Sequence, residues 1–225
     1  MENLIQIAGI RNLAEADMLI AAGAGALGFP LRLNIHAPDL SEEAAAEIVR
    51  QIRKRVCCIL ITYLSRASRI VELADFLGVD MVQIHGPIAI AELQKIRVEK
   101  PGLRLIKSLV VAPDNLNVLE QQIQLLSSRV DYFITDTFDP VSGASGATGK
   151  THDWAISRHL VEVSSRPVIL AGGLTPENVS DAIRAVRPAG VDVHTGIENS
   201  DGGKDLLLAR QFIQNARDAF DRFKN

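Results

Sequence analysis

The chain has 225 residues, of which 47% are hydrophobic and 23% are charged, and this composition excludes a disordered polymer. Lys and Arg number 24 against 27 Asp and Glu, so the net charge of -3 gives no chain-wide attraction to nucleic acid or to an acidic membrane. The apolar runs are far shorter than the roughly 18 residues that span a bilayer, and we expect no basic leader at Met1. The adjacent Cys57 and Cys58 fit neither a disulfide framework nor a zinc site, and we expect them to pack as small hydrophobes. These features predict a cytoplasmic protein without a metal, in which local groups bind any anionic ligand.

Short apolar runs rich in β-branched residues alternate with segments of helical periodicity, which is typical of βα units around a parallel sheet. The predicted strands are Leu4–Ala8, Ala24–Phe29, Val56–Ile61, Val79–Ile84, Leu103–Leu109, Val130–Asp136, Pro167–Ala171 and Val191–Thr195. The predicted helices are Leu13–Ala22, Glu42–Lys54, Ser65–Leu77, Ile88–Lys100, Leu116–Ser127, Trp154–Glu162, Pro176–Val186 and Lys204–Phe223.

Capping residues support these helix boundaries. Ser41 offers a hydroxyl to the free amides at the start of one helix, and Thr175 is expected to do the same with Pro176 at the first helical position. Glycines are predicted to end three helices in the left-handed conformation, namely Gly23, Gly78 and Gly190.

Eight βα units in a chain of this length predict a single (β/α)₈ barrel covering residues 1–225. A doubly wound open sheet is the main alternative, because strand number alone does not separate the two folds. No Gly-x-Gly-x-x-Gly follows the first strand, which favours the barrel, and no linker rich in Pro, Gly or Ser divides the chain.

The reactive groups of such barrels lie at the carboxyl ends of the strands. Gly172-Gly173 and Thr195-Gly196 follow the last two predicted strands, where glycine turns and free amides favour a phosphate site, although glycines also make tight turns. Asp136 ends the sixth strand, where partial burial would raise its pKa toward that of a general acid; a turn or cap role is the alternative.

Three further polar residues fall at strand ends. His85 and His194 can each donate to a substrate oxygen or simply bond a loop carbonyl. Lys107 can meet a phosphate or carboxylate, or pair with a neighbouring acid inside the barrel.

Four segments together resemble the phosphoribosylanthranilate isomerase family of tryptophan biosynthesis: Val82–Gly86, Gly146–Trp154, Leu170–Val179 and Val191–Glu198. The resemblance implies a (β/α)₈ barrel that performs an Amadori rearrangement of an aminoaldose phosphate without metal or organic cofactor. In this family an Asp protonates the ring oxygen and a Cys removes the C2 proton.

The resemblance assigns several roles to this chain. It places the acid at Asp136. It places the phosphate site at Gly172, Gly173, Thr195 and Gly196. Together with the strand-end position of Lys107, it predicts further substrate contacts at Gln83, His85, Lys107, Thr148 and Gly149.

The chain departs from the family at the first strand, which usually ends Lys-Ile-Cys-Gly. Here the sequence is Gln6-Ile7-Ala8-Gly9, so Ala8 occupies the position of the base. The loop after the second strand lacks the usual Ser-x-Arg that meets the anthranilate carboxylate, and Arg32 is the nearest substitute. His194 stands where the family usually has Ser.

These departures leave more than one function open. The first hypothesis is a phosphoribosyl-amine isomerase in which His194, His36 or water replaces the thiol as base. The alternatives are a relative that binds a phosphorylated metabolite without isomerising it, a family member acting on a different sugar phosphate, and an ordinary enzyme that has lost its base. All of them predict a small phosphorylated ligand and no nucleic-acid or membrane partner, in a monomer or a homodimer.

Overall fold

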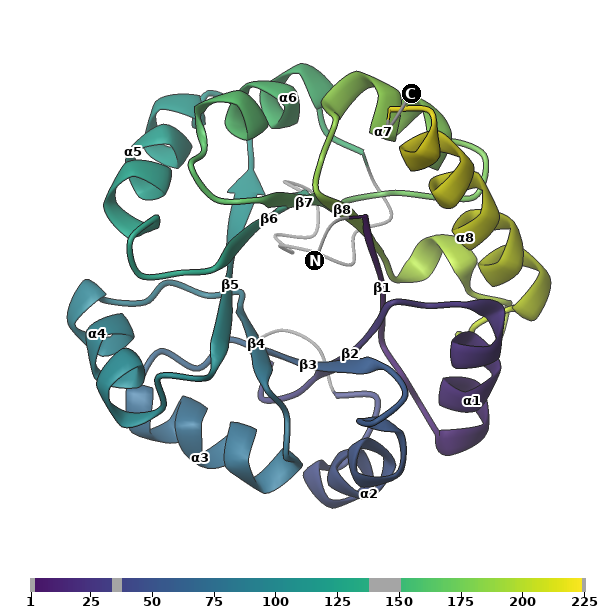
Figure 1. The fold of residues 1–225 in the computed structure, drawn as a ribbon, viewed down its shortest axis with the longest axis horizontal. Coiled ribbons are helices and arrows are strands. Elements are labelled where there is room, and N and C mark those ends of the chain that lie inside the picture. Colours follow the sequence, from purple (N-terminus) through teal and green to yellow (C-terminus); the bar gives the residue numbers. More distant parts are fainter. Residues whose placement is uncertain (1–2, 34–37, 138–150, 224–225) are drawn as a thin grey trace.

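The computed structural model describes residues 3–33, 38–137 and 151–223. Its eight parallel strands follow one another in chain order and close into a barrel, with β1 hydrogen-bonded to β8 and the helices outside (Figure 1). The predicted barrel is therefore confirmed, and the open sheet is wrong. Closure follows from the pairing of Leu4 with Gly190, which joins the first strand to the last.

The strands are β1 (Leu4–Ala8), β2 (Ala26–Pro30), β3 (Cys57–Thr62), β4 (Met81–Ile84), β5 (Arg104–Val111), β6 (Tyr132–Thr137), β7 (Val168–Leu170) and β8 (Gly190–Val193). The helices are α1 (Leu13–Ala22), α2 (Glu42–Ile52), α3 (Ala67–Leu77), α4 (Ile90–Glu99), α5 (Leu116–Leu126), α6 (Trp154–Val163), α7 (Val179–Val186) and α8 (Leu206–Asp221). A short 3₁₀ helix, η1 (Thr195–Ile197), follows β8 and was not predicted.

Side chains alternate between two cores because successive residues of a strand point to opposite faces. The inner core fills the barrel with Leu4, Ala8, Ala26, Ile59, Ile61, Met81, Ile106, Ile134, Ile169 and Ala171. The outer core lies between the strands and the helices and is larger. The strands are buried on both faces, which explains why their sequences read as nearly continuous apolar runs.

The structure confirms three of the predicted cap residues, Ser41, Gly23 and Gly78. Ser41 Oγ accepts a hydrogen bond from the Ala44 amide at 3.2 Å. Gly23 and Gly78 end α1 and α3 with φ angles of 101° and 72°. These left-handed conformations cost least without a Cβ, so glycine is favoured there.

Two predictions around α7 are wrong. The helix begins at Val179 rather than at Pro176, because Asn178 precedes it as the cap residue. It ends at Val186, as predicted, and the cap residue that follows, Arg187, takes the left-handed φ of 53°. Gly190 instead lies in β8, where an added Cβ would come within 2.6 Å of the Leu4 carbonyl oxygen. Glycine is needed at this position for close strand contact, not for a helix end.

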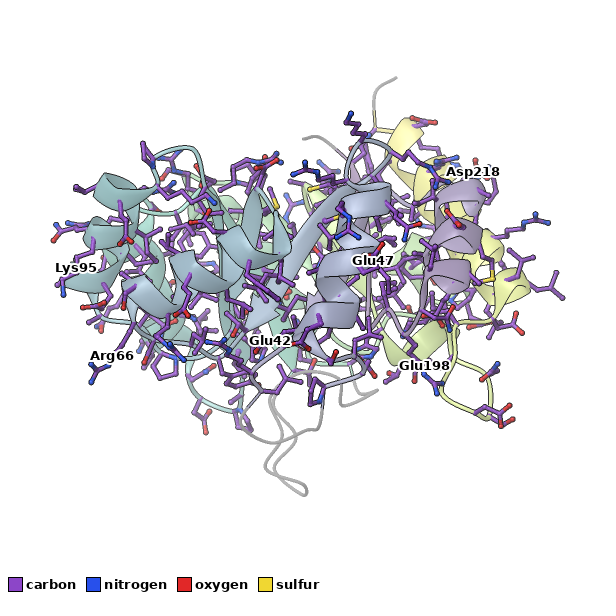
Figure 2. All side chains as sticks on the ribbon, turned by 90° about the horizontal axis from the view of Figure 1, so that it is seen from below. Glu42, Glu47, Arg66, Lys95, Glu198 and Asp218 are labelled. Carbon is purple, nitrogen blue, oxygen red and sulfur yellow. The ribbon has the colours of Figure 1, made fainter. Side chains whose placement is uncertain are left out.

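The carboxyl ends of the strands share one end of the barrel with the starts of the helices. Glu42 and Arg66, at the starts of α2 and α3, and Glu198, after β8, lie along one edge of the molecule, opposite Asp218 of α8 (Figure 2). Cys57 begins β3 at the other end of the strands. No helix within the described residues is long and apolar enough to cross a membrane.

Candidate active site

A cavity of about 510 Å³ opens at the carboxyl ends of the strands, and we call it the central cavity. It brings together most of the residues predicted from the sequence, namely Ala8, Gln83, His85, Asp136, Gly172, Gly173, His194, Thr195 and Gly196. These residues come from β1, β4, β6 and the loops after β7 and β8, so only closure of the barrel makes them neighbours.

Asp136 lies near the end of β6 with its side chain only 13% exposed. The Thr137 amide donates to its Oδ1 at 2.8 Å, and His85 Nδ1 lies 3.9 Å from its Oδ2. Burial raises the pKa of Asp136 to about 7, although the bond from Thr137 opposes this. The carboxyl group therefore exists in both protonation states near neutral pH, as a proton donor requires.

A second buried carboxyl group, Asp192, faces the same cavity from β8. Burial raises its pKa to about 8, and the charge of Asp136 adds to this effect. Its Oδ1 is buried without a hydrogen-bond partner. Asp192 is therefore mainly protonated at pH 7 and can donate a hydrogen bond to a ligand. Asp192 was not among the residues predicted for the site, although strand alternation from Gly190 to His194 was a signal that could have placed it inward.

Below these carboxyl groups lies a layer of amide and hydroxyl side chains. Gln6 Nε2 donates to Gln83 Oε1 at 3.1 Å, and Gln83 Nε2 donates to Ser108 Oγ at 3.4 Å. The same hydroxyl shares a 3.0 Å hydrogen bond with His85 Nδ1. This network fixes the orientation of Gln83 and His85 at the base of the cavity.

The loops after β7 and β8 have no room for larger residues. Gly172 has a φ of +101°, and a Cβ there would lie 2.2 Å from Thr137 Oγ1. A Cβ at Gly196 would lie 1.9 Å from the Leu174 carbonyl oxygen. The backbone of both loops therefore lines the cavity directly, which is the arrangement that an anion needs in order to reach main-chain amides.

His152 supports the first of these loops and was also given no role by the sequence analysis. Its Nδ1 shares a 2.8 Å hydrogen bond with Thr137 Oγ1, and its Nε2 shares one of 2.5 Å with Ser157 Oγ. Burial lowers the pKa of His152 to about 4, so the ring is neutral and bridges two hydroxyl groups. It thereby holds the end of β6 against α6, close to Gly172.

The imidazole of His194 packs against the chain immediately after Ala8. A Cβ on Gly9 would lie 2.2 Å from His194 Nε2, so the ring covers this glycine. Nε2 is 3.4 Å from Glu198 Oε1, and the same carboxylate accepts a 2.6 Å hydrogen bond from Lys204 Nζ. The imidazole ring of His194 therefore lies beside the end of β1, where the family usually has a thiol. The Glu198 carboxylate stabilises the protonated form of this ring.

Lys107 does not line the central cavity. It points outward from the barrel, because its strand neighbour Ile106 points inward. Its Nζ donates to the Ser108 carbonyl at 2.8 Å and to the His85 carbonyl at 3.4 Å. Among the described residues, Lys107 forms no ion pair with a neighbouring acid, which was the alternative prediction for this side chain.

Other predicted residues are tied elsewhere or lie outside the described part of the chain. Arg32 forms a two-point ion pair with Glu42, with distances of 2.7 and 2.9 Å, and does not line the central cavity. Thr148, Gly149 and His36 lie outside the described residues. Among the residues that are described, no group of three or more His, Cys, Asp or Glu side chains could hold a metal ion.

The model of the family N-(5′-phosphoribosyl)anthranilate (PRA) isomerase matches residues 5–215. The chain belongs to this family. It is 36% identical to N-(5′-phosphoribosyl)anthranilate isomerase 2 of Methanosarcina mazei over 98% of this chain and 97% of that protein.

Solved structures of isomerases have the same fold. A complex with reduced 1-(o-carboxyphenylamino)-1-deoxyribulose 5-phosphate aligns with a TM-score of 0.79 at 28% identity, over 96% of this chain and 99% of the other. Monomers generated from the dimeric isomerase of Thermotoga maritima align with a TM-score of 0.77 at 28% identity and the same coverage.

Ala8, at the position where the resemblance to PRA isomerases placed the base, lies at the wall of the central cavity. Ala8 lines the central cavity with its methyl group, and a Cβ added at Gly28 would lie 3.3 Å from it. Ala8 therefore lies between Gly28 of β2 and Gly9, the next residue in the chain, which the His194 ring covers.

Proposed function

We propose that this chain isomerises N-(5′-phosphoribosyl)anthranilate to the corresponding aminoketose phosphate, with Asp136 as general acid and His194 as general base. The observation that carries the proposal is the carboxyl group of Asp136, whose pKa burial raises to about 7, in one cavity with the glycine loops after β7 and β8. The family membership and the bound aminoketose phosphate analogue in a related structure support the same substrate class.

The reaction begins with ring opening. Asp136 donates its proton to the ring oxygen of the ribose, and the C1–O bond breaks with its electron pair moving to that oxygen. The lone pair of the anthranilate nitrogen then forms a double bond to C1. A carboxyl group with a pKa near the working pH is suited to this donation, because it is readily reprotonated for the next cycle.

Proton removal from C2 completes the isomerisation. His194 takes this proton, the C2–H electron pair forms a C1–C2 double bond, and the electrons of the carbon–nitrogen double bond return to nitrogen. The resulting enol tautomerises to the ketose as C1 gains a proton. Glu198, 3.4 Å from the ring, stabilises the imidazolium that forms.

The remaining cavity residues bind and orient the substrate. Gly172, Gly173, Thr195 and Gly196 line the cavity and would bind the phosphate through their backbone amides. Protonated Asp192, which lines the cavity from β8, donates a hydrogen bond to a substrate oxygen. A volume of about 510 Å³ lies in the range of small-molecule sites.

One observation favours a second candidate function. The methyl group of Ala8 cannot accept a proton, so a protein that binds a phosphorylated sugar without isomerising it would also fit this cavity. This candidate predicts binding of the reduced aminoketose phosphate analogue without turnover.

A steady-state assay distinguishes the two functions. Loss of substrate fluorescence is followed with the purified wild type and with Asp136→Asn, which keeps the size of the side chain but cannot donate a carboxylic proton. We expect turnover by the wild type and a decrease of about 10²- to 10⁴-fold in the variant. Wild-type turnover equal to that of the variant, together with binding of the reduced analogue, would overturn the isomerase assignment in favour of the binding protein.

We propose a cytoplasmic location and leave the assembly as either a monomer or a homodimer. The dimeric state of the Thermotoga maritima relative makes the homodimer a specific alternative. Light scattering during size-exclusion chromatography separates the two, because one chain has a mass of 24.4 kDa.

A further inference from the structure

The ring of helices around the barrel opens between α4 and α5. All other neighbouring helices pack against each other, whereas α4 and α5 make few direct contacts (Figure 1). A second cavity of about 600 Å³, the side cavity, occupies this place outside the barrel. Its walls are mostly apolar and include Ile88 and Ile90 beside α4 and Leu119, Leu125 and Leu126 of α5.

One charged side chain lies at the inner wall of the side cavity. Lys107 extends outward from β5 and is 6% exposed. Its ammonium group has three N–H donors, of which two bind the carbonyl oxygens of Ser108 and His85. The third has no acceptor among the described residues. Burial without a neighbouring acid lowers the pKa of Lys107 to about 8.

The other polar groups of the side cavity do not supply a counter-ion. Lys107 is the only Lys, Arg, Asp or Glu among the described residues that line it. Asn115 uses its amide to donate to the Val110 carbonyl and its oxygen to accept from the Ala112 amide. An uncompensated cation in an apolar cavity is unfavourable, and an anion that reaches it would be strongly bound.

We propose that the side cavity binds a small organic molecule with an apolar body and a single carboxylate, which pairs with Lys107. One cation and apolar walls suit a monocarboxylate better than a phosphate dianion, which needs several donors. A volume of about 600 Å³ is typical of small-molecule sites and too small for a folded partner. This site is separate from the central cavity, although His85 and Tyr63 line both.

Two matched probes test the charge requirement. The titration uses 3-phenylpropionate and its neutral analogue 3-phenylpropionamide on the full chain, with backbone amide shifts followed by NMR. We expect the acid to bind at least about tenfold more tightly, with shifts at the side cavity, including Gly86 and Leu119. Equal affinity of acid and amide, or shifts confined to the central cavity, would overturn the proposal.

Two pairs of variants locate the site. Lys107→Met removes the charge and keeps the length, and it should abolish the preference for the acid, while Lys54→Met on the surface should not. Leu125→Asp places a carboxylate in the wall of the side cavity and should weaken binding of the acid. Val118→Asp is its control, because Val118 is 52% exposed on the same helix and does not line the cavity. Undiminished binding to both Lys107→Met and Leu125→Asp would also overturn the proposal.

Discussion

The two sides of the central cavity differ in how closely they follow the family pattern. On the side of β7 and β8, packing restricts two glycines: a Cβ at Gly172 would lie 2.2 Å from the Thr137 hydroxyl oxygen, and a Cβ at Gly196 would lie 1.9 Å from the Leu174 carbonyl oxygen. On the side of β1, Ala8 lines the cavity with a methyl group. Packing therefore restricts substitution of the glycines on the phosphate side, whereas the side chain that performs proton transfer can change without disturbing the barrel.

The largest expected effect concerns the base. His194→Ala should lower kcat by about 10²- to 10⁴-fold with little change in KM, because it removes the proposed proton acceptor but not the phosphate loops. Introducing Ala8→Cys into the same variant should restore much of the loss, because the thiol would enter the space beside the imidazole. The control is His159→Ala on α6, which should leave kcat unchanged. An unaltered kcat in His194→Ala would remove this histidine from the mechanism.

The next effect is on the pH dependence of stability. The native Asp192 carboxyl has its pKa raised from 3.8 to about 8, so the native state holds a proton that the unfolded state loses above about pH 4. The free energy of unfolding of the wild type therefore falls as pH rises from 4 to 8. Asp192→Asn removes the part of this fall that Asp192 contributes, while Asp136, whose pKa is also raised, still contributes its own part; the variant should be stabilised relative to the wild type by about 2–4 kcal/mol more at pH 8 than at pH 5.

Urea unfolding at the two pH values measures this difference. Asp218→Asn is the control, since Asp218 is exposed on α8 at the other end of the molecule (Figure 2). If Asp192→Asn and the wild type lose stability in parallel between pH 5 and 8, burial of a protonated Asp192 is wrong.

The smallest effect tests the phosphate side. Gly172→Ala forces a side chain into the left-handed φ of +101° and against Thr137, so the loop must shift. Such strain costs about 1–3 kcal/mol, and we expect it to raise KM by about 10- to 100-fold while kcat changes less. Gly102→Ala is the matched control, because its Cβ would meet nothing within 4 Å. A KM for Gly172→Ala close to that of Gly102→Ala would show that the rigid phosphate side does not set substrate affinity.

Residue patterns predicted much of the fold and part of the candidate site. The run Leu4–Ala8 and the helix Leu13–Ala22 match the structure at both ends, because a buried strand and a helix ended by Gly23 are defined by nearby residues. Asp136 was placed correctly at the cavity, because it ends an apolar run that predicts a strand, and the ends of the strands meet at the cavity. Local chemistry is sufficient for such features.

Features that depend on contacts across the barrel were missed. Gly190 was predicted to end a helix, but its need for a glycine comes from the Leu4 carbonyl of another strand. Lys107 was expected near the substrate; strand alternation already indicates that it points outward, and only the tertiary structure shows that it lines the side cavity there. The raised pKa of Asp192 depends on burial and on Asp136 from a different strand.

The sequence by itself determined the order of strands and helices, the glycine turns after β7 and β8, and the absence of the thiol at Ala8. Each of these follows from residues that are neighbours in the chain. Only the tertiary structure decided that His194 lies over Gly9, that Asp136 and Asp192 share one cavity, and that Lys107 lies in another. Those relations arise when β8 pairs with β1 and closes the barrel, because closure brings distant residues together and removes water from their charged groups.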